Sequence, residues 1–269
     1  MARCCRWTDG KHLGSEAHVS FARIVVPEVL DSLPANAPEA QTSRRDLQLV
    51  HRVMGSRGIV LRALRSLPGV RLGTRPLRVL ELGAGDGSLM LGVARSLQGE
   101  WPTVSLTLLD LHNLLSPTAT ADYKAVGWEV RAQVGDVLSW AAGESAGGLP
   151  HNALRWDLIV ANLFLHHFQA PQLITLLAAA AARSEHFFAC EPRRAGLALA
   201  GSHLIGALGV NAVTREDAVL SVRAGFRGTE LSALWPGSSP GWTLSEYSAG
   251  LFSHCLIASH AAGAHADLH

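Results

Sequence analysis

A glycine-rich segment, RVLELGAGDGSL, follows a short apolar run and holds Gly83, Gly85 and Gly87. Glycine adopts positive φ angles without steric cost and lets a ligand approach the backbone closely. Two acids, Glu81 and Asp86, lie beside these glycines. A helix beginning near Gly87 would add free N–H groups and the positive end of its dipole. The segment therefore predicts either a simple tight strand–helix turn or a ligand-binding loop.

The two acids decide which ligands suit such a loop. A dinucleotide site has the spacing G-x-G-x-x-G and holds a pyrophosphate at the helix end. Here the third glycine comes one residue earlier, and Asp86 lies inside the loop. Carboxylates at Glu81 and Asp86 would repel a pyrophosphate. They favour a ligand with a cationic or hydroxyl-bearing surface.

Strands and helices alternate along the chain, and these elements must position the loop. Apolar runs predict strands at residues 77–82, 103–110, 128–136, 155–162, 186–191, 225–235 and 249–259. Helical patterns fall at residues 87–98, after Pro117, and at 171–184, 195–209 and 214–224. This order predicts an α/β fold: a doubly wound, seven-stranded, mostly parallel sheet with an antiparallel last strand and helices on both faces. Such sheets bind ligands at the carboxyl ends of their strands.

Four segments, in this order, resemble the signatures of the class I S-adenosylmethionine-dependent methyltransferases that act on small molecules. They are VLELGAGDGSL, LTLLDLH, GDVLSW and WDLIVANLFLHHF, and the match covers roughly residues 75–260. The resemblance implies a Rossmann-like methyltransferase fold. It implies S-adenosylmethionine as cofactor, S-adenosylhomocysteine as product, and no metal. The cofactor-binding residues that it implies are Glu81, Gly83, Ala84, Gly85, Asp110, Leu111, Asp136, Val137 and Asn162.

The resemblance assigns roles to three of the acids. Asp110 would accept hydrogen bonds from the two ribose hydroxyls, and Asp136 would lie toward the exocyclic amine of the adenine. Glu81 would face the loop N–H groups or, through water, the cofactor's ammonium. A strand-end cap is the alternative for Asp110, and a helix N-cap is the alternative for Asp136.

His166 and His167 follow the fourth strand, where the methyl acceptor is expected to lie. Imidazole is well matched to proton removal near neutral pH, and a phenol with a pKa of about 10 would benefit from such a base. Adjacent side chains point differently, so one histidine is expected to face the acceptor, and packing or helix capping is the alternative role. Glu191 ends the fifth strand and is expected either to bind the acceptor or to pair with Arg193 or Arg194. No nearby carboxylate cluster completes a metal site in the sequence.

The chain is expected to divide at the start of the sheet. Prolines favour an extended linker in the first region, so residues 1–42 are expected to form an N-terminal extension that is partly flexible. Ser43 can cap a helix, and helical spacing then continues to Leu67. Residues 43–74 are therefore expected to form a helical cap over the active site. The remaining regions are a methyltransferase domain, an acceptor-binding insertion within it and a flexible tail, at residues 75–260, 192–222 and 261–269.

The expected reaction is O-methylation of a small, largely apolar or aromatic acceptor, such as a phenolic metabolite of polyketide or quinone type. The substrate-binding candidates are His51, Arg57, His203 and Asn211. C- or N-methylation of a small metabolite, a binding module without catalysis and a nicotinamide oxidoreductase are the alternatives. A nucleic-acid or protein methyltransferase is disfavoured because ANLF stands where an N/D-P-P-Y/F signature would follow the fourth strand.

Composition sets further limits. A hydrophobic share of 48% and a charged share of 17% are typical of a globular protein, and the net charge of +1 predicts no nucleic-acid partner. Four cysteines without a C-x-x-C pair indicate a reduced, cytoplasmic protein. The longest apolar stretch, residues 195–210, is too short for a membrane span. A homodimer is left open.

Overall fold

The computed structural model describes residues 21–34, 36–70, 75–144, 155–237 and 241–261. Most of the expected tail and the first part of the expected extension therefore lie outside the described residues.

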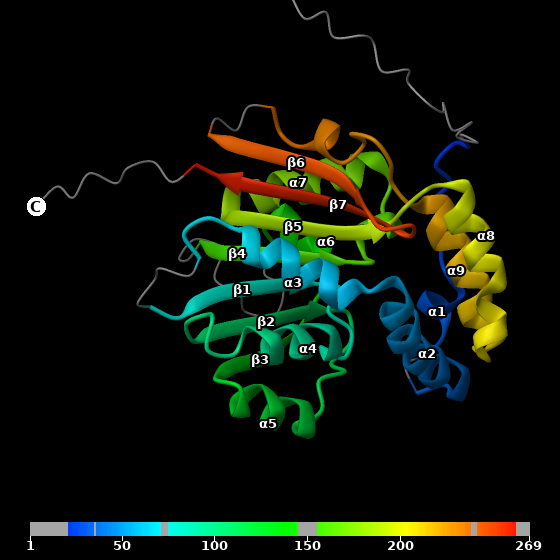
Figure 1. Cartoon of the computed structure of the whole chain (residues 1–269), viewed down its shortest axis with the longest axis horizontal. Helices are drawn as coiled ribbons and strands as arrows, with labels where there is room; N and C mark the ends of the chain where they lie inside the picture. The colour runs from blue at the N-terminus through cyan, green and yellow to red at the C-terminus, as the bar shows by residue number, and fades with distance from the viewer. Residues whose placement is uncertain (1–20, 35, 71–74, 145–154, 238–240, 262–269) are drawn as a thin grey trace, which may run out of the picture.

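A seven-stranded sheet in the order β3-β2-β1-β4-β5-β7-β6 forms the centre of the molecule (Figure 1). Its strands are β1 (Leu77–Leu82), β2 (Val104–Asp110), β3 (Trp128–Val134), β4 (Trp156–Asn162), β5 (Ser184–Pro192), β6 (Trp242–Ala249) and β7 (Ser253–His260). The first five strands are parallel, and β7 is antiparallel to both β5 and β6. The expected doubly wound sheet with an antiparallel last strand is confirmed. Its strand order reverses between β1 and β4, which makes that edge the ligand-binding switch point.

Helices cover both faces of the sheet (Figure 1). They are α1 (Val29–Ser32), α2 (Pro38–Met54), α3 (Ser56–Ser66), α4 (Ser88–Leu97), α5 (Pro117–Ala125), α6 (Val137–Ala142), α7 (Ala170–Arg183), α8 (Gly196–Leu204) and α9 (Ala212–Ala224), with short 3-10 turns η1 (Leu165–His167), η2 (Ile205–Leu208) and η3 (Ser232–Leu234).

The alternation of side chains along β1 explains the two layers. Successive side chains of a strand point to opposite faces. Val79 lies in one core with residues of α3, α4 and α5, whereas Leu80 lies in the other core with residues of α6 and α7. Both residues have no exposed surface. The apolar run therefore needs helices on both sides to be shielded from water.

The helices α1, α2, α8 and α9 gather beyond the carboxyl ends of the parallel strands, at the right of Figure 1. Ser43 Oγ in α2 lies 2.8 Å from Thr214 Oγ1 in α9, and both residues are buried. Asp217 in α9 accepts hydrogen bonds from the backbone N–H groups of Val29 and Leu30, at 2.7 and 3.1 Å. The insertion after β5 and the N-terminal helices thus form one layer at this edge. By contrast, α3, which was expected to belong to the helical cap, packs on the sheet. The expected domain boundaries stay a prediction.

The expected helix start at Ser43 is wrong. Helix α2 begins earlier, at Pro38, with Ala37 as its N-cap residue. Proline suits the first turn of a helix because its missing N–H would have no partner there. Ser43 instead lies inside the helix and binds α9.

The expected strand at residues 225–235 is also wrong. This segment contains an isolated bridge at Phe226 and the turn η3 but no strand, and the strand beside β7 begins later, at Trp242. Glu246 accepts hydrogen bonds from the backbone N–H groups of Leu231 and Ser232, at 3.0 and 2.7 Å, so a side chain replaces a strand partner. Leu231 and Trp235 bury their side chains in the core on the α7 side. Their apolar character, which suggested a strand, serves this packing.

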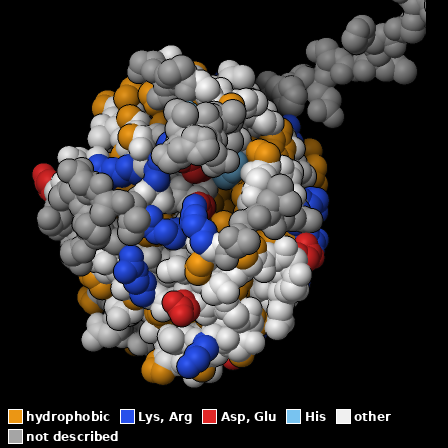
Figure 2. Space-filling model, turned by 90° about the vertical axis from the view of Figure 1, so that its left-hand side faces the viewer, with side chains coloured by type: hydrophobic (Ala, Val, Ile, Leu, Met, Phe, Trp, Pro, Cys, Tyr) orange, Lys and Arg blue, Asp and Glu red, His pale blue; other side chains and the backbone are white. Residues whose placement is uncertain are grey.

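Figure 2 shows the opposite face, at the amino ends of the parallel strands, where basic side chains are prominent among the described residues. Part of this charge is paired within the protein: Arg75 pairs with Asp157, and Arg155 Nη1 lies 3.1 Å from Glu185 Oε1. The absence of a nucleic-acid partner stays a prediction. None of the helices in the described part of the chain is long and apolar enough to cross a membrane.

Candidate active site

The glycine loop leaves the carboxyl end of β1 and turns into α4. Gly83, Gly85 and Gly87 have φ angles of 64°, 56° and 73°, in the left-handed region that favours glycine. The N–H of Gly83 donates to Leu109 O, and the N–H of Gly85 donates to Asp110 Oδ2, both at 2.9 Å. A Cβ added at Gly85 would meet no atom within 4 Å. Strand β2 thus holds a loop whose backbone is open to a ligand at Gly85.

Asp86 has a contact that sequence reasoning did not assign. Its Oδ1 accepts a hydrogen bond from the N–H of Ser88 at 2.9 Å, at the start of α4. Its Oδ2 accepts one from Nε2 of Gln48 in α2, also at 2.9 Å. Asp86 therefore stabilises the first turn of α4 and ties the loop to the helical layer.

Glu81 and Asn162 carry buried oxygens that lack hydrogen-bond partners within the described residues. These atoms are Glu81 Oε2, one residue before the end of β1, and Asn162 Oδ1, at the end of β4. Burial raises the pKa of Glu81 well above its usual value, and the charges of Asp86 and Asp110 raise it further. Buried polar atoms are nearly always hydrogen-bonded in native proteins. Two such atoms at the switch point therefore indicate a ligand with donors.

Asp110 caps the end of β2, the alternative role considered for it from sequence, and its carboxylate can still accept further hydrogen bonds. Its Oδ2 accepts from Gly85, and its Oδ1 accepts from the N–H of His112 at 3.0 Å. Each carboxylate oxygen has a second lone pair, and the Asp110 side chain is half-buried at the end of β2. Both oxygens can therefore still accept hydroxyl donors.

The remaining residues expected at the cofactor vary in exposure. Asp136 is the N-cap of α6, with the N–H groups of Leu138 and Ser139 at 3.2 and 3.3 Å from its oxygens, so the alternative left open for it is what the structure shows. Val137 is buried, Ala84 is half-buried and Leu111 is 64% exposed.

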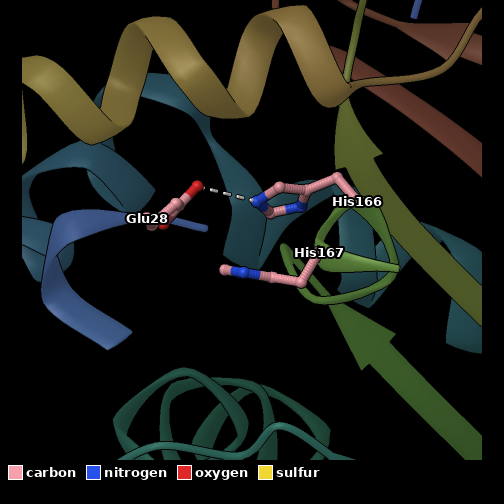
Figure 3. Close-up of side chains that lie close together, drawn as sticks. All are labelled: Glu28, His166 and His167. Atoms are coloured by element: carbon pink, nitrogen blue, oxygen red, sulfur yellow. Dashed lines mark hydrogen bonds and ion pairs between the residues drawn. The ribbon is translucent and has the colours of Figure 1, made fainter. Parts of the chain in front are cut away.

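His166 lies between two carboxylates, of which Figure 3 shows Glu28. Its Nδ1 is 2.8 Å from Glu191 Oε2, and its Nε2 is 3.2 Å from Glu28 Oε1. Burial alone would lower the pKa of His166, but the hydrogen bonds to Glu191 and Glu28 outweigh it and raise that pKa to about 9. An imidazolium donates from both nitrogens. His166 is therefore held as a cation near neutral pH, with neither nitrogen free to accept a proton.

Glu191 holds the loop that carries the histidines. It is fully buried, and the backbone N–H groups of residues 164–166 donate to it at distances between 2.9 and 3.3 Å. Its partner is His166 and not the arginines expected from sequence, of which Arg194 pairs with Glu230. Glu191 is thus a positioning residue.

His167 is the more accessible histidine, with 23% of its side chain exposed. Its Nδ1 lies 3.1 Å from Asp31 Oδ2. Its ring centroid is 6.3 Å from that of Phe164, and Phe164 packs so closely on Gly83 that an added Cβ would lie 2.1 Å from its ring. One aromatic ring therefore separates His167 from the glycine loop.

The N-terminal segment crosses this site in an ordered way. The Arg23 guanidinium donates to the backbone oxygens of His166, Phe168 and Ala224, at 3.1, 2.9 and 2.7 Å. Sequence reasoning missed Glu28 and Asp31 because they lie in a region expected to be an extension. Their spacing of three residues on one helical turn was the available signal.

Leu163 connects Asn162 to the histidine loop with strained geometry. Its φ is 50°, and it is the non-glycine residue with positive φ in the described ranges. Such strain costs on the order of 1–3 kcal/mol and clusters at functional sites. The N–H of Leu163 donates to Cys190 O at 2.8 Å, which anchors the turn to β5.

Two of the four substrate-binding candidates, His51 and His203, do not cap a helix with their side chains. His51 is half-buried on α2; burial lowers its pKa, and the charge of Asp86 opposes that shift, which places His51 near the glycine loop. His203 is exposed on α8.

The other two candidates have structural contacts. The Arg57 side chain lies over α4, 2.9 Å from where a Cβ of Gly92 would be. Asn211 caps α9: its side chain accepts from the N–H of Thr214 at 2.8 Å and donates to Glu39 O at 3.0 Å. These contacts already engage Asn211 on both ends of its amide.

Comparison with known proteins relates the fold of this chain to solved structures. No family model and no curated protein matches the chain. The plantazolicin methyltransferase BpumL in complex with SAH matches with a TM-score of 0.58 and 11% identity, over 84% of this chain and 91% of that one. The chain has the methyltransferase fold. The pyocyanin biosynthetic protein PhzM matches at 0.52 and 14%, and a putative O-methyltransferase from Nostoc punctiforme at 0.53 and 12%. The match with PhzM covers 87% of this chain and 62% of PhzM, and the match with the Nostoc protein covers 86% of this chain and 64% of that protein.

S-adenosylmethionine fits the hydrogen-bond acceptors at the ligand-binding edge of this sheet. Its methionine part carries an ammonium, which suits the unpartnered Glu81 oxygen, and its ribose carries the vicinal hydroxyls that suit Asp110. The open backbone at Gly85, whose N–H is bound to Asp110, leaves room for a ligand beside this acid. The fit rests on residues at the switch point of the sheet.

Replacing Gly85 by alanine is expected to weaken S-adenosylhomocysteine binding at least about tenfold and to destabilise the fold by about 1–2 kcal/mol, because Ala is strained at positive φ. Calorimetry and urea unfolding measure the two effects. Gly99→Ala is the matched control, since Gly99 also has a positive φ, 78°, and open space around it. It should show the same stability loss with unchanged affinity; equal affinity losses in both variants would contradict the role of Gly85.

Proposed function

We propose that this chain transfers a methyl group from S-adenosylmethionine to the oxygen of a small, largely apolar or aromatic acceptor, such as a phenolic metabolite of polyketide or quinone type. The observation that carries the proposal is the position of His167. It lies one aromatic ring from the glycine loop, at the carboxyl edge of the sheet, with a carboxylate on its Nδ1. A base and a cofactor loop are thus neighbours.

His167 removes the acceptor's proton in this proposal. Its Nε2 accepts the proton of the hydroxyl while Asp31 keeps the other ring nitrogen protonated and the ring oriented. His166 cannot take this role, because Glu191 and Glu28 bind both of its nitrogens. It serves instead to hold the N-terminal segment against the loop.

The cofactor is held by the residues at the switch point. When bound, S-adenosylmethionine supplies an electrophilic methyl group, and the protein supplies position and exclusion of water. Asp110 binds the ribose hydroxyls and Glu81 faces the ammonium. Orientation of this kind contributes about 7–11 kcal/mol to lowering a barrier.

C- or N-methylation would use the same cofactor loop without needing His167 as a base, and a binding module would need no turnover at all. The proposal also places the chain among the methyltransferases that act on small molecules, in the cytoplasm and as a homodimer. It further includes contacts of the acceptor with His51 or His203.

Two measurements test the proposal. Asp110→Asn is expected to weaken S-adenosylhomocysteine binding about 10–100-fold, because a carboxylate makes hydrogen bonds worth about 1.5–3 kcal/mol. Calorimetry checks this value, and Asp122→Asn is the control, since Asp122 pairs with Arg95 at 2.9 Å. Incubation with S-adenosylmethionine and a panel of phenols, naphthols and hydroxyquinones, read by mass spectrometry, should yield a methyl ether. Binding without any methylated product, or methylation on carbon or nitrogen, would contradict O-methylation.

A further inference from the structure

We propose that Glu28, His166 and His167 form a binding site for a divalent transition-metal ion such as Zn²⁺. Each residue offers one ligand atom, and the three atoms lie within 4.8 Å of one another. Figure 3 shows the carboxylate and the two imidazoles converging from the N-terminal segment and from the loop after β4. The site goes beyond methyl transfer because it needs neither cofactor nor acceptor.

The spacing of two of the ligand atoms already suits zinc. Nε2 of His166 and Oε1 of Glu28 are 3.2 Å apart. Two atoms that bind tetrahedral zinc at about 2.0–2.1 Å lie about 3.3 Å from each other. The ion can therefore enter between them without a backbone movement, and it replaces the proton that they share.

The third ligand is a ring nitrogen of His167. Its side chain is 23% exposed, and its ring centroid lies 4.3 Å from that of His166. The exposure leaves the ring free to turn toward an ion held by the other two residues. It also provides an entry path from solvent.

Both imidazoles are oriented as metal-binding histidines usually are. A ligating histidine generally donates its other N–H to a carboxylate, which fixes the tautomer and increases the basicity of the ligand atom. Here Glu191 lies 2.8 Å from Nδ1 of His166, and Asp31 lies 3.1 Å from Nδ1 of His167. Both Nε2 atoms are thereby directed away from these carboxylates. Three carboxylates and two imidazoles thus form one arrangement of ligands and their supports.

The donor set selects the kind of ion. Two imidazole nitrogens and one carboxylate oxygen suit Zn²⁺ or Co²⁺, whereas Mg²⁺ and Ca²⁺ prefer oxygen ligands throughout. The ion would occupy the His167 lone pair that the proposed reaction uses for the acceptor's proton. Bound zinc is therefore an inhibitor of this site and not its cofactor.

Metal titration of the full chain tests the site directly. For this experiment Cys4→Ser and Cys5→Ser are introduced into the full chain and into every variant, so that the adjacent cysteines cannot bind the ion. Co²⁺ absorption and Zn²⁺ calorimetry, without cofactor, should show one tight equivalent. Glu28→Gln and His167→Asn should each weaken it at least about tenfold, and Asp31→Asn about 10–100-fold. His112→Asn, at an exposed histidine after β2, should leave it unchanged.

Thermal unfolding without metal shows whether each variant is folded, and added Zn²⁺ should raise Tm in the parent more than in Glu28→Gln or His167→Asn. His167 is partly exposed, so its variant keeps the test valid if Glu28→Gln does not fold. If the parent and both variants bind Zn²⁺ equally, the cluster is an ion pair only and the proposal is overturned. This result does not depend on methyl transfer, which the phenol assay tests separately.

Discussion

Replacing His167 by glutamine is expected to lower kcat for methylation of a phenolic acceptor about 10²–10⁴-fold, the usual contribution of a general base. Glutamine keeps the size of the side chain but cannot take a proton near neutral pH. The affinity for S-adenosylhomocysteine should change less than about twofold, because Phe164 lies between His167 and the glycine loop. Steady-state kinetics and calorimetry measure the two quantities on the same preparation.

His112→Gln is the matched control for this experiment, since His112 is an exposed histidine just after β2, on the same edge of the sheet. It should leave both quantities unchanged. Asp31→Asn should lower kcat with little change in KM, because it removes the carboxylate that orients His167. Turnover of His167→Gln within a few-fold of the parent would exclude His167 as the base.

Binding of S-adenosylhomocysteine is expected to release a proton from Glu81 and to become tighter as pH rises. Burial, aided by the charges of Asp86 and Asp110, raises the pKa of Glu81 well above its usual value, so the free protein keeps Glu81 protonated to a higher pH than an exposed glutamate. The ammonium of the ligand favours the ionised carboxylate. Affinity should therefore increase up to about tenfold per pH unit below the raised pKa. Calorimetry between about pH 6 and about pH 8, in buffers of different ionisation enthalpy, counts the protons released.

Glu81→Gln removes this titration, and its stability gives the sign of the same linkage. A glutamate that is protonated when folded and ionised when unfolded binds more protons in the native state, so stability falls as pH rises from about 4.3 toward the raised pKa. The variant should lose both this slope and the pH dependence of binding. Glu129→Gln, at an exposed position on β3, should keep both. A pH-independent affinity in the parent would contradict the role of Glu81.

The sequence by itself determined the parallel part of the sheet and the glycine loop. The apolar run of β1 with Gly83 and Gly85 after it, and that of β2 with Asp110 at its end, are local patterns whose meaning depends on a few adjacent residues. The strand–helix alternation restricts connections to a doubly wound sheet, and the carboxyl ends of β1, β2 and β4 must then meet at one edge.

Only the tertiary structure separated the roles of the two histidines. Adjacent residues in HHF have the same local signal, but the carboxylates of Glu28 and Asp31 reach His166 and His167 across 138 and 136 residues of chain. Glu28 and Glu191 together bind both nitrogens of the His166 ring, and Asp31 orients the His167 ring. The same physical reason applies to Ser43, whose hydroxyl binds α9 instead of capping a helix. Side-chain roles that depend on distant partners follow from packing, which local residue patterns do not contain.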